Sequence, residues 1–264
     1  ALTGVAGGAS RSALTFHFTK DNNAADIAAK EGTQETAATL IGMLLGYLVV
    51  KSTTNSLWMQ WIVFGLLTLL HLYANWRAMR SLHLTSLNAS RIRIAYEKYN
   101  AGSKSRSKKN IALPDPKQMA KLEHILFLPR FGGKGRCFRI VMGAHLKNLV
   151  RDDTRCLADL IDAYCKEKYL MGVKGTKILV CLMSGIDEAS LLKAYVHALA
   201  LQTALTKHPR ATAGAQKASE DKARVWMSKN WVHFHAMLRD SGWDLKSILV
   251  QAQRHRALWK TTMD

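Results

Sequence analysis

The first third of the chain is dominated by two runs of apolar residues. The longer run, residues 57–74 (LWMQWIVFGLLTLLHLYA), would measure roughly 27 Å as a helix, about the thickness of a hydrocarbon core. Trp58 stands at one end and Trp76 just beyond the other, as in helices whose ends reach the headgroups. The pattern predicts a membrane-spanning helix. The alternative is a helix buried in a soluble bundle, because three polar residues interrupt the run: Gln60, Thr68 and His71.

A shorter uncharged run precedes the longer one. Residues 36–50 (TAATLIGMLLGYLVV) contain Gly42 and Gly46, whose spacing lets two helix backbones approach closely in lipid. An ordinary packed helix explains this spacing about as well. The polar segment KSTTN separates the two runs and suits a turn. We therefore predict an antiparallel helical hairpin with arms at residues 33–50 and 57–76.

The charge distribution changes abruptly after the longer run. Lys and Arg number 38 against 19 Asp and Glu, a formal net charge of +19, yet residues 1–75 are neutral and the excess begins at Arg77. By the positive-inside rule, this basic side faces the cytoplasm or its organellar equivalent. The excess indicates a polyanionic partner, either an anionic membrane surface or nucleic acid. Six residues are candidates for contact with anionic lipid: Arg77, Arg80, Arg91, Arg93, Lys108 and Lys109.

A polar segment lies upstream of the hairpin. Residues 22–31 suit a helix that ends at Gly32, and Asn22, Asp26 and Lys30 would share one of its faces. Such a stripe beside apolar helices indicates a ligand site, because ionisable groups at membrane depth are costly. A solvated surface helix with an Asp26–Lys30 ion pair explains the same spacing. The candidate residues for a ligand or partner are Arg11, His17, Asn22, Asn23, Asp26, Lys30, Glu31, Gln34 and Glu35.

The second half of the chain changes period after a polar linker at residues 100–118. Short apolar runs at residues 137–142, 169–173 and 178–183 predict strands, and the last two are joined by a hairpin turn at Lys174 and Gly175. A helix is expected at residues 154–166, between the first two strands. The predicted order is β-α-β-β.

Three further helices are expected after these strands. Ser184 is expected to cap the first helix together with Asp187, and Ser219 is expected to cap the second. Asp244 is expected to cap the last helix, which would run towards Trp259. Aromatic residues of the second helix are interpreted as packing, with nucleobase stacking as the alternative.

The predicted fold is α-rich. An apolar, membrane-type helical domain is followed by a small α+β domain and C-terminal helices. The expected boundaries are residues 1–99 for the helical domain, 100–118 for the linker and 119–264 for the α+β module with its helices.

No arrangement of residues typical of catalysis is found. The four cysteines contain no CxxC pair and are interpreted as reduced core thiols. The glycine-rich residues 131–136 (FGGKGR) lack the spacing of a phosphate-binding loop, and His233 and His235 would lie on different helix faces. We therefore expect a protein that is not an enzyme and that needs no cofactor or metal.

The sequence closely resembles the Root UVB Sensitive (RUS) family. The residues that carry the resemblance include GVAGGASRSALTFHFTKDNNAADIAAKEGTQETAATLIGMLLG, LLTLLHLYANWRAMRSLHLTSLN, DAYCKEKYLMGV, LLKAYVHALAL and LRDSGWDLKSILVQAQRHRALWK. The resemblance covers nearly all of the chain, and family members usually carry a further amino-terminal portion. It implies a membrane-associated protein without established enzymatic chemistry. In plants the family is linked to UV-B responses, auxin transport and vitamin B6 homeostasis.

Three functional classes follow, of which the third, an enzyme, has the least support because no acid/base or nucleophile arrangement emerges. The first is a membrane-associated protein of this family that binds a small molecule or a protein partner. For this class the resemblance implies an organellar membrane, which would be a plastid membrane in a plant or alga. It also implies a homo-oligomer, or a hetero-oligomer with another RUS-family protein. Its sharper form is a carrier of a B6 vitamer that uses Asn22, Asp26, Lys30 and Gln34. The second class is a soluble basic RNA-binding or organellar ribonucleoprotein component, which the net charge supports.

Overall fold

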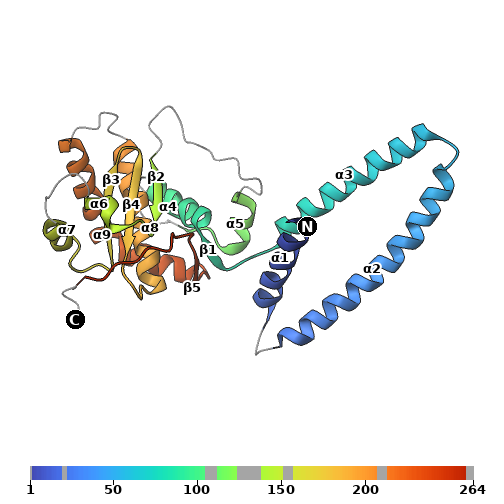
Figure 1. Ribbon diagram of the computed structural model, residues 1–264, viewed down its shortest axis with the longest axis horizontal. Coiled ribbons are helices and arrows are strands. Elements are labelled where there is room, and N and C mark those ends of the chain that lie inside the picture. Colours follow the sequence, from blue (N-terminus) through green and yellow to red (C-terminus); the bar gives the residue numbers. More distant parts are fainter. Residues whose placement is uncertain are drawn as a thin grey trace. The chain divides into compact units, whose positions relative to one another are not determined.

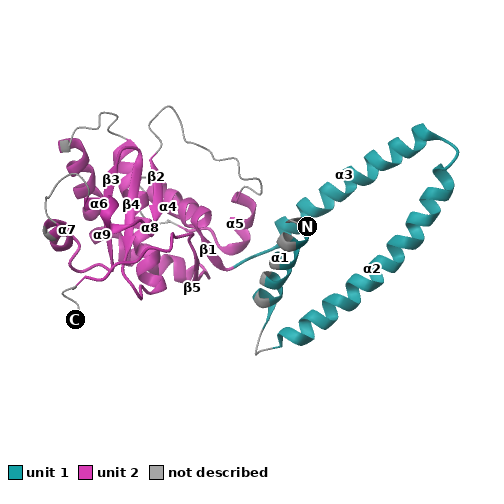
Figure 2. Cartoon of the chain, in the orientation of Figure 1, with its two compact units in different colours: residues 1–84 teal, residues 85–264 magenta. Residues whose placement is uncertain are grey.

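The computed structural model describes residues 2–19, 23–104, 112–123, 138–150, 157–206 and 213–259. The chain divides into two compact units, Ala1–Leu84 and Thr85–Asp264 (Figure 2). The first unit consists of three helices (Figure 1): α1 (Leu2–Phe18), α2 (Ala24–Thr53) and α3 (Leu57–Ser81). The predicted fold class is confirmed, because long apolar N-terminal helices precede a small α/β region with helices near the C-terminus.

The predicted helical hairpin is present as α2 and α3, which meet at a short turn (Figure 1). Ser56 begins α3, because its hydroxyl oxygen accepts a hydrogen bond of 3.4 Å from the backbone N–H of Met59. The predicted helix end at Gly32 is wrong, since α2 continues through it. An isolated glycine costs a helix only about 1 kcal/mol, and alanine-rich flanking sequence offsets that cost.

The second unit contains two small sheets. Its first half comprises β1 (Ser86–Asn88), α4 (Ala89–Lys104), α5 (Pro116–Leu122), β2 (Arg139–Met142), α6 (Leu146–Val150) and α7 (Leu157–Ala163). Its second half comprises β3 (Tyr169–Lys174), β4 (Lys177–Leu182), α8 (Glu188–Thr206), α9 (Ala213–Asp240) and β5 (Asp244–Leu249).

The three-stranded sheet has the order β2-β4-β3. Strands β3 and β4 form the predicted antiparallel hairpin, in which Gly175 takes the left-handed backbone conformation that the turn needs (φ 59°). Strand β2 joins β4 in parallel, and α7 lies between β2 and β3 along the chain, so the predicted strand and helix order is confirmed. The central strand β4 is buried over residues 178–182.

Helix α8 forms the centre of the core. Leu192, Val196 and Leu199 are buried at helical spacing, and α8 packs against α9, α4 and the sheet. Its cap is Asp187, whose carboxylate accepts a hydrogen bond of 3.1 Å from the Ser190 backbone N–H. The cap predicted at Ser184 is therefore displaced by three residues.

Two other predictions for the C-terminal part are wrong. Ser219 does not cap a helix but lies buried within α9, where its hydroxyl donates to the Ala215 carbonyl over 2.8 Å. The helix expected after Asp244 is the strand β5, which pairs in parallel with β1. Asp244 accepts from the Lys246 backbone N–H and donates its own N–H to the Thr85 carbonyl, so it binds within a sheet instead of starting a helix.

The compact units also divide at a different place from the predicted linker. Helix α4 was assigned from sequence to the helical domain, but it belongs to the second unit and packs against α8. The apolar face of α4 explains this, since Ile92, Tyr96 and Tyr99 are buried. The middle of the linker, residues 105–111, lies outside the described residues.

Candidate functional site: an exposed apolar hairpin with an ionic base

The hairpin presents apolar side chains around its whole circumference. Both α2 and α3 are long and apolar enough to cross a membrane, and their most apolar windows are 6% and 0% buried. Trp58 is 81% exposed and Leu69 66% exposed. Apolar surface on this scale is unusual for a protein in water and marks a surface that contacts a membrane or another protein. Within the first unit, the chain's own described helices do not cover these residues.

The polar residues of α3 are satisfied within the hairpin. The Gln60 side-chain amide donates to the Thr53 carbonyl over 3.3 Å, and the Thr68 hydroxyl donates to the Phe64 carbonyl over 2.8 Å. His71 Nε2 and Asn75 Nδ2 lie 2.9 Å apart and share a hydrogen bond. Each of these three side chains has at least one hydrogen-bond partner, and these bonds reduce but do not remove the cost of placing the polar atoms in lipid.

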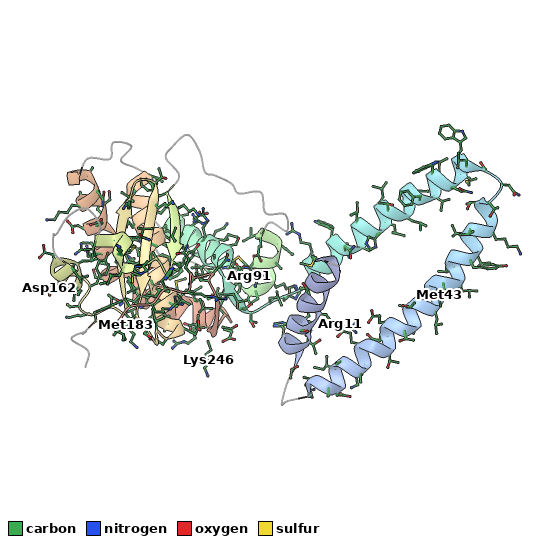
Figure 3. The ribbon with its side chains drawn as sticks, viewed as in Figure 1. Arg11, Met43, Arg91, Asp162, Met183 and Lys246 are labelled. Atoms are coloured by element: carbon green, nitrogen blue, oxygen red, sulfur yellow. The ribbon has the colours of Figure 1, made fainter. Side chains whose placement is uncertain are left out.

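An ionic cluster joins α1 to α2 at the base of the hairpin. Arg11 is labelled in Figure 3, and its Nε lies 3.0 Å from Glu31 Oε1 while one terminal nitrogen lies 2.8 Å from Glu35 Oε2. The Thr15 hydroxyl donates to Glu31 Oε2 over 3.3 Å. Arg11 and Glu31 expose 45% and 42% of their side chains, so the cluster is open to solvent. Two carboxylates against one guanidinium leave the group with a net charge of −1.

The remaining upstream candidates do not join this cluster. Asp26 and Lys30 form a separate exposed ion pair of 3.0 Å, as the surface-helix interpretation expects. Asn23 precedes α2 and makes no side-chain cap bond, and the His17 ring contacts Phe18 edge-on at 5.0 Å. Gln34 is exposed on α2. Asn22 lies outside the described residues.

The predicted lipid-contacting residues fall into two groups. Arg77 is exposed near the end of α3, and the Arg80 guanidinium lies over the Trp76 ring at 5.7 Å. Both residues lie at the end of α3 away from the turn, where the sequence analysis placed the membrane surface. Lys108 and Lys109 lie outside the described residues.

Arg91 and Arg93 belong to the second unit and have structural partners there. Arg91 Nε lies 2.8 Å from Glu123 Oε2, with 11% and 20% of the two side chains exposed, and another guanidinium nitrogen donates to the Ser86 carbonyl over 2.9 Å. Arg93 donates to the Gln202 side-chain oxygen over 2.8 Å. The structure thus assigns both residues to packing between elements. The sequence could not show this, because the partners lie 32 and 109 positions away.

The interior of the second unit holds a polar pair that the sequence analysis missed. The Tyr169 hydroxyl lies 2.9 Å from His197 Nδ1, and both residues are buried. Burial and then the positive charges of Arg224 and Lys193 lower the pKa of His197 to about 3, and burial raises the pKa of Tyr169 well above its ordinary value. A histidine in the apolar run AYVHALAL was the available signal. Both groups are neutral at pH 7 and support the core.

Groups suited to hold a metal ion are absent from the described residues. The two cysteines that the structure describes, Cys165 and Cys181, form no disulfide, and burial raises the pKa of the Cys181 thiol. The glycine-rich residues 131–136 and the other two cysteines lie outside the described residues.

The fold and the site define a two-part protein: an exposed apolar hairpin with an ionic base, followed by a folded α/β module. Residues 1–103 match the Vitamin B6 photo-protection and homoeostasis domain, and residues 114–259 match the C-terminal domain of Root UVB sensitive proteins. The chain belongs to the RUS family. The boundary between the two matched domains falls in the predicted linker, whereas the compact units divide earlier, between residues 84 and 85.

Comparison with curated relatives agrees with this assignment. The chain is 35% identical over 266 residues to Protein root UVB sensitive 3 of Arabidopsis thaliana, a match that covers 98% of this chain and 57% of that protein. It is 42% identical over 130 residues to RUS family member 1 of Dictyostelium discoideum, covering 48% of this chain and 23% of that protein. Protein root UVB sensitive 5 of Arabidopsis thaliana is 28% identical over 159 residues, a match that covers 59% of this chain and 29% of that protein. No solved structure matches the chain.

Proposed function

We propose that this RUS-family chain inserts its α2–α3 hairpin into a membrane and acts there in vitamin B6 homeostasis as a binding protein and not as an enzyme. The observation that carries the proposal is the exposure of apolar side chains around both helices. Burying such side chains in hydrocarbon contributes about 25 cal/mol for each Å² removed from water. Ordinary soluble packing within the described residues supplies no such cover.

Membrane extraction tests the first part of this proposal. The full chain is expected to stay in the membrane pellet after alkaline carbonate or high salt and to need detergent for release, because salt does not weaken apolar burial. Release by carbonate or salt alone would refute insertion and would indicate a peripheral protein held by its positive charge.

The orientation follows from the charges at the hairpin's base. Arg77 and Arg80 lie near the end of α3, and the ionic cluster of Arg11, Glu31 and Glu35 lies near the start of α2. Because the hairpin is antiparallel, these two ends fall on the same side of the membrane. We propose that this side is cytoplasmic or stromal and that the two exit arginines contact anionic headgroups, each worth on the order of 1 kcal/mol.

The ionic cluster is the proposed place for a vitamer. B6 vitamers carry hydroxyl groups and a pyridine ring, and some carry a phosphate. The Glu31 and Glu35 carboxylates can accept hydroxyl hydrogens, while Arg11 can donate to a phosphate or phenolate oxygen. The cluster's exposure leaves it accessible, and its position at the base of the hairpin sets it near the proposed headgroup level.

A thermal-shift titration of the detergent-solubilised full chain with pyridoxine, pyridoxal and pyridoxal 5′-phosphate tests this site. A vitamer that binds only the folded chain at 100 times its Kd should stabilise it by about 2.7 kcal/mol. Glu31→Gln combined with Glu35→Gln should abolish the shift, whereas the matched control Asp26→Asn, in a separate ion pair on the same helix, should retain it. Absence of a shift in the unaltered chain, or equal loss in both variants, would refute this site.

A further inference from the structure

The turn of the hairpin contains one established contact between α2 and α3. Thr53 is the buried residue of α2, and the Gln60 side chain donates to its carbonyl over 3.3 Å. Away from this turn the two helices diverge (Figure 1), and a Cβ atom placed on Gly42 or Gly46 would meet nothing within 4 Å. The inner surfaces of the two helices are therefore in contact only near the turn.

The sequence continues the same contact along both helices. We count back along α2 from Thr53, and forward along α3 from Gln60, in alternating steps of four and three residues. Each step pairs one residue of α2 with one residue of α3 at the same height along the hairpin. This spacing is that of a two-helix seam. The pairs are Thr53 with Gln60, Val49 with Phe64, Gly46 with Leu67, Gly42 with His71, Thr39 with Ala74, Glu35 with Ala78, and Gly32 with Ser81.

Three of the seven pairs match a glycine with a larger residue. A glycine faces a larger side chain in the pairs of Leu67, His71 and Ser81, and such small residues let helix backbones approach closely in lipid. The α3 side of the seam carries Gln60 and His71, polar groups that hydrocarbon does not solvate. The opposite face of α3, with Ile62, Leu69 and Trp76 at 100° per residue, is apolar and suits lipid.

We propose that the α2–α3 hairpin closes along this seam within the membrane, so that the inner face of α2 covers the polar stripe of α3. The occupant of the stripe is thus the same chain's own helix, and the closed interface is continuous with the Thr53–Gln60 contact. Closure leaves the apolar outer faces of both helices to the lipid. This proposal rests on the membrane insertion proposed above, because insertion removes the water that otherwise solvates Gln60 and His71.

Disulfide crosslinking of the full chain in vesicles of phosphatidylcholine and phosphatidylglycerol tests closure. The test variant carries Thr39→Cys and Ala74→Cys, a pair within the seam and far from the turn. The control carries Leu44→Cys and Leu69→Cys, which lie at a similar level on the outer faces. Trypsin places each pair in peptides 31–51 and 52–77, which contain none of the native cysteines. A linked pair of these peptides therefore reports on α2 and α3 alone.

We expect the test variant to give at least about tenfold more linked peptide than the control, because a disulfide needs Cα atoms about 4.4–6.8 Å apart. Equal yields, or no link in the test variant, would overturn closure. A mixture of the single variants Thr39→Cys and Ala74→Cys shows whether the link forms within one chain or between two copies. If this mixture gave linked peptides at the same yield, the seam would be a contact between copies, and that result would also overturn closure.

Flotation of the same vesicles keeps the two proposals distinguishable. A chain that fails to float refutes insertion, whereas a chain that floats without forming the link refutes closure alone. If the test variant does not insert while the unaltered chain does, Gly46→Cys with Leu67→Cys provides a second seam pair in the same two peptides.

Discussion

Glu123→Gln would remove the carboxylate that accepts the Arg91 Nε hydrogen bond in the second unit. In the structure Glu123 receives two hydrogen bonds of 2.8 Å, one from Arg91 Nε and one from the Asn88 side-chain amide. The two charged side chains are only 11% and 20% exposed, so water replaces the lost contact poorly. The neutral amide retains an acceptor for Asn88 but no longer balances the charge of Arg91.

The expected cost is a loss of about 2–3 kcal/mol in the free energy of unfolding. Breaking a fully buried ion pair costs about 3–5 kcal/mol, and the partial exposure of this pair reduces that figure. For a folded unit of this size each kcal/mol lowers Tm by about 2–4 °C, so the second unit should unfold about 4–12 °C earlier. The matched control is Asp187→Asn at the Lys168–Asp187 pair, whose side chains are 41% and 47% exposed, and its ion pair should contribute at most about 1 kcal/mol.

Hydrogen exchange of the full chain, followed by mass spectrometry of peptides from α4 and α5, measures this loss locally. A second assay separates the structural role of Arg91 from the lipid contact expected from sequence. Arg91→Ala should speed hydrogen exchange in the α4 and α5 peptides and leave binding to anionic vesicles unchanged. Arg77→Ala should weaken binding to anionic vesicles and leave hydrogen exchange in these peptides unchanged. Unchanged exchange in Glu123→Gln, or weakened vesicle binding by Arg91→Ala without destabilisation, would refute this reasoning.

Three further predictions concern the second unit. Gly143→Ala should lower the free energy of unfolding by about 1–3 kcal/mol in urea titrations, because Gly143 has a φ of 71° and an added Cβ would lie 2.3 Å from the Gln253 carbonyl oxygen. Lowering the pH from 6.5 towards 3 should reduce the free energy of unfolding by up to about 1.4 kcal/mol per pH unit. The reason is that His197 has a pKa of about 3 in the folded chain, so over this pH range its imidazole takes up a proton in the unfolded chain but not in the folded one. Thermal melts at a series of pH values should show this slope. Asp187→Ala should cost about 0.5–2 kcal/mol in urea titrations, because α8 loses its cap.

Each of these predictions has a matched comparison. Gly175→Ala also places a side chain at positive φ but meets no atom within 4 Å, so it should cost less than the change at Gly143, and equal costs would contradict the predicted clash. His197→Phe should remove the histidine's part of the pH slope, and an unaltered slope would assign it to other groups. Asp187→Asn keeps a capping oxygen, so a loss as large as that in Asp187→Ala would argue against capping.

The local pattern determined the elements wherever periodicity and turn chemistry agreed. The β3–β4 hairpin followed from two apolar runs around a Lys-Gly turn, and the α2–α3 hairpin followed from two uncharged runs around a polar segment. The end predicted at Gly32 failed because one glycine is a weak helix breaker. Asp244 failed as a cap because its partner in strand β1, Ser86, lies 158 positions away along the chain.

For the candidate site, too, some features could be predicted from sequence and others only from the packing of the helices. Sequence identified Arg11, Glu31 and Glu35 as candidates because they are charged residues beside apolar helices, but only the packing of α1 on α2 shows that they form one cluster. Asp26 and Lys30 were paired correctly, since the pair is local to one helix turn.

The sequence by itself therefore determined the family, the apolar hairpin and the order of β2, α7, β3 and β4. Apolar period and turn residues act between near neighbours, so local pattern was enough for these elements. Tertiary structure alone decided which polar groups far apart along the chain are partnered. Arg91 meets Glu123, and Tyr169 meets His197, across distances along the chain that no local pattern encodes. The physical reason is that an ion pair or a buried hydrogen bond depends on the three-dimensional position of both partners, which only the folded packing supplies.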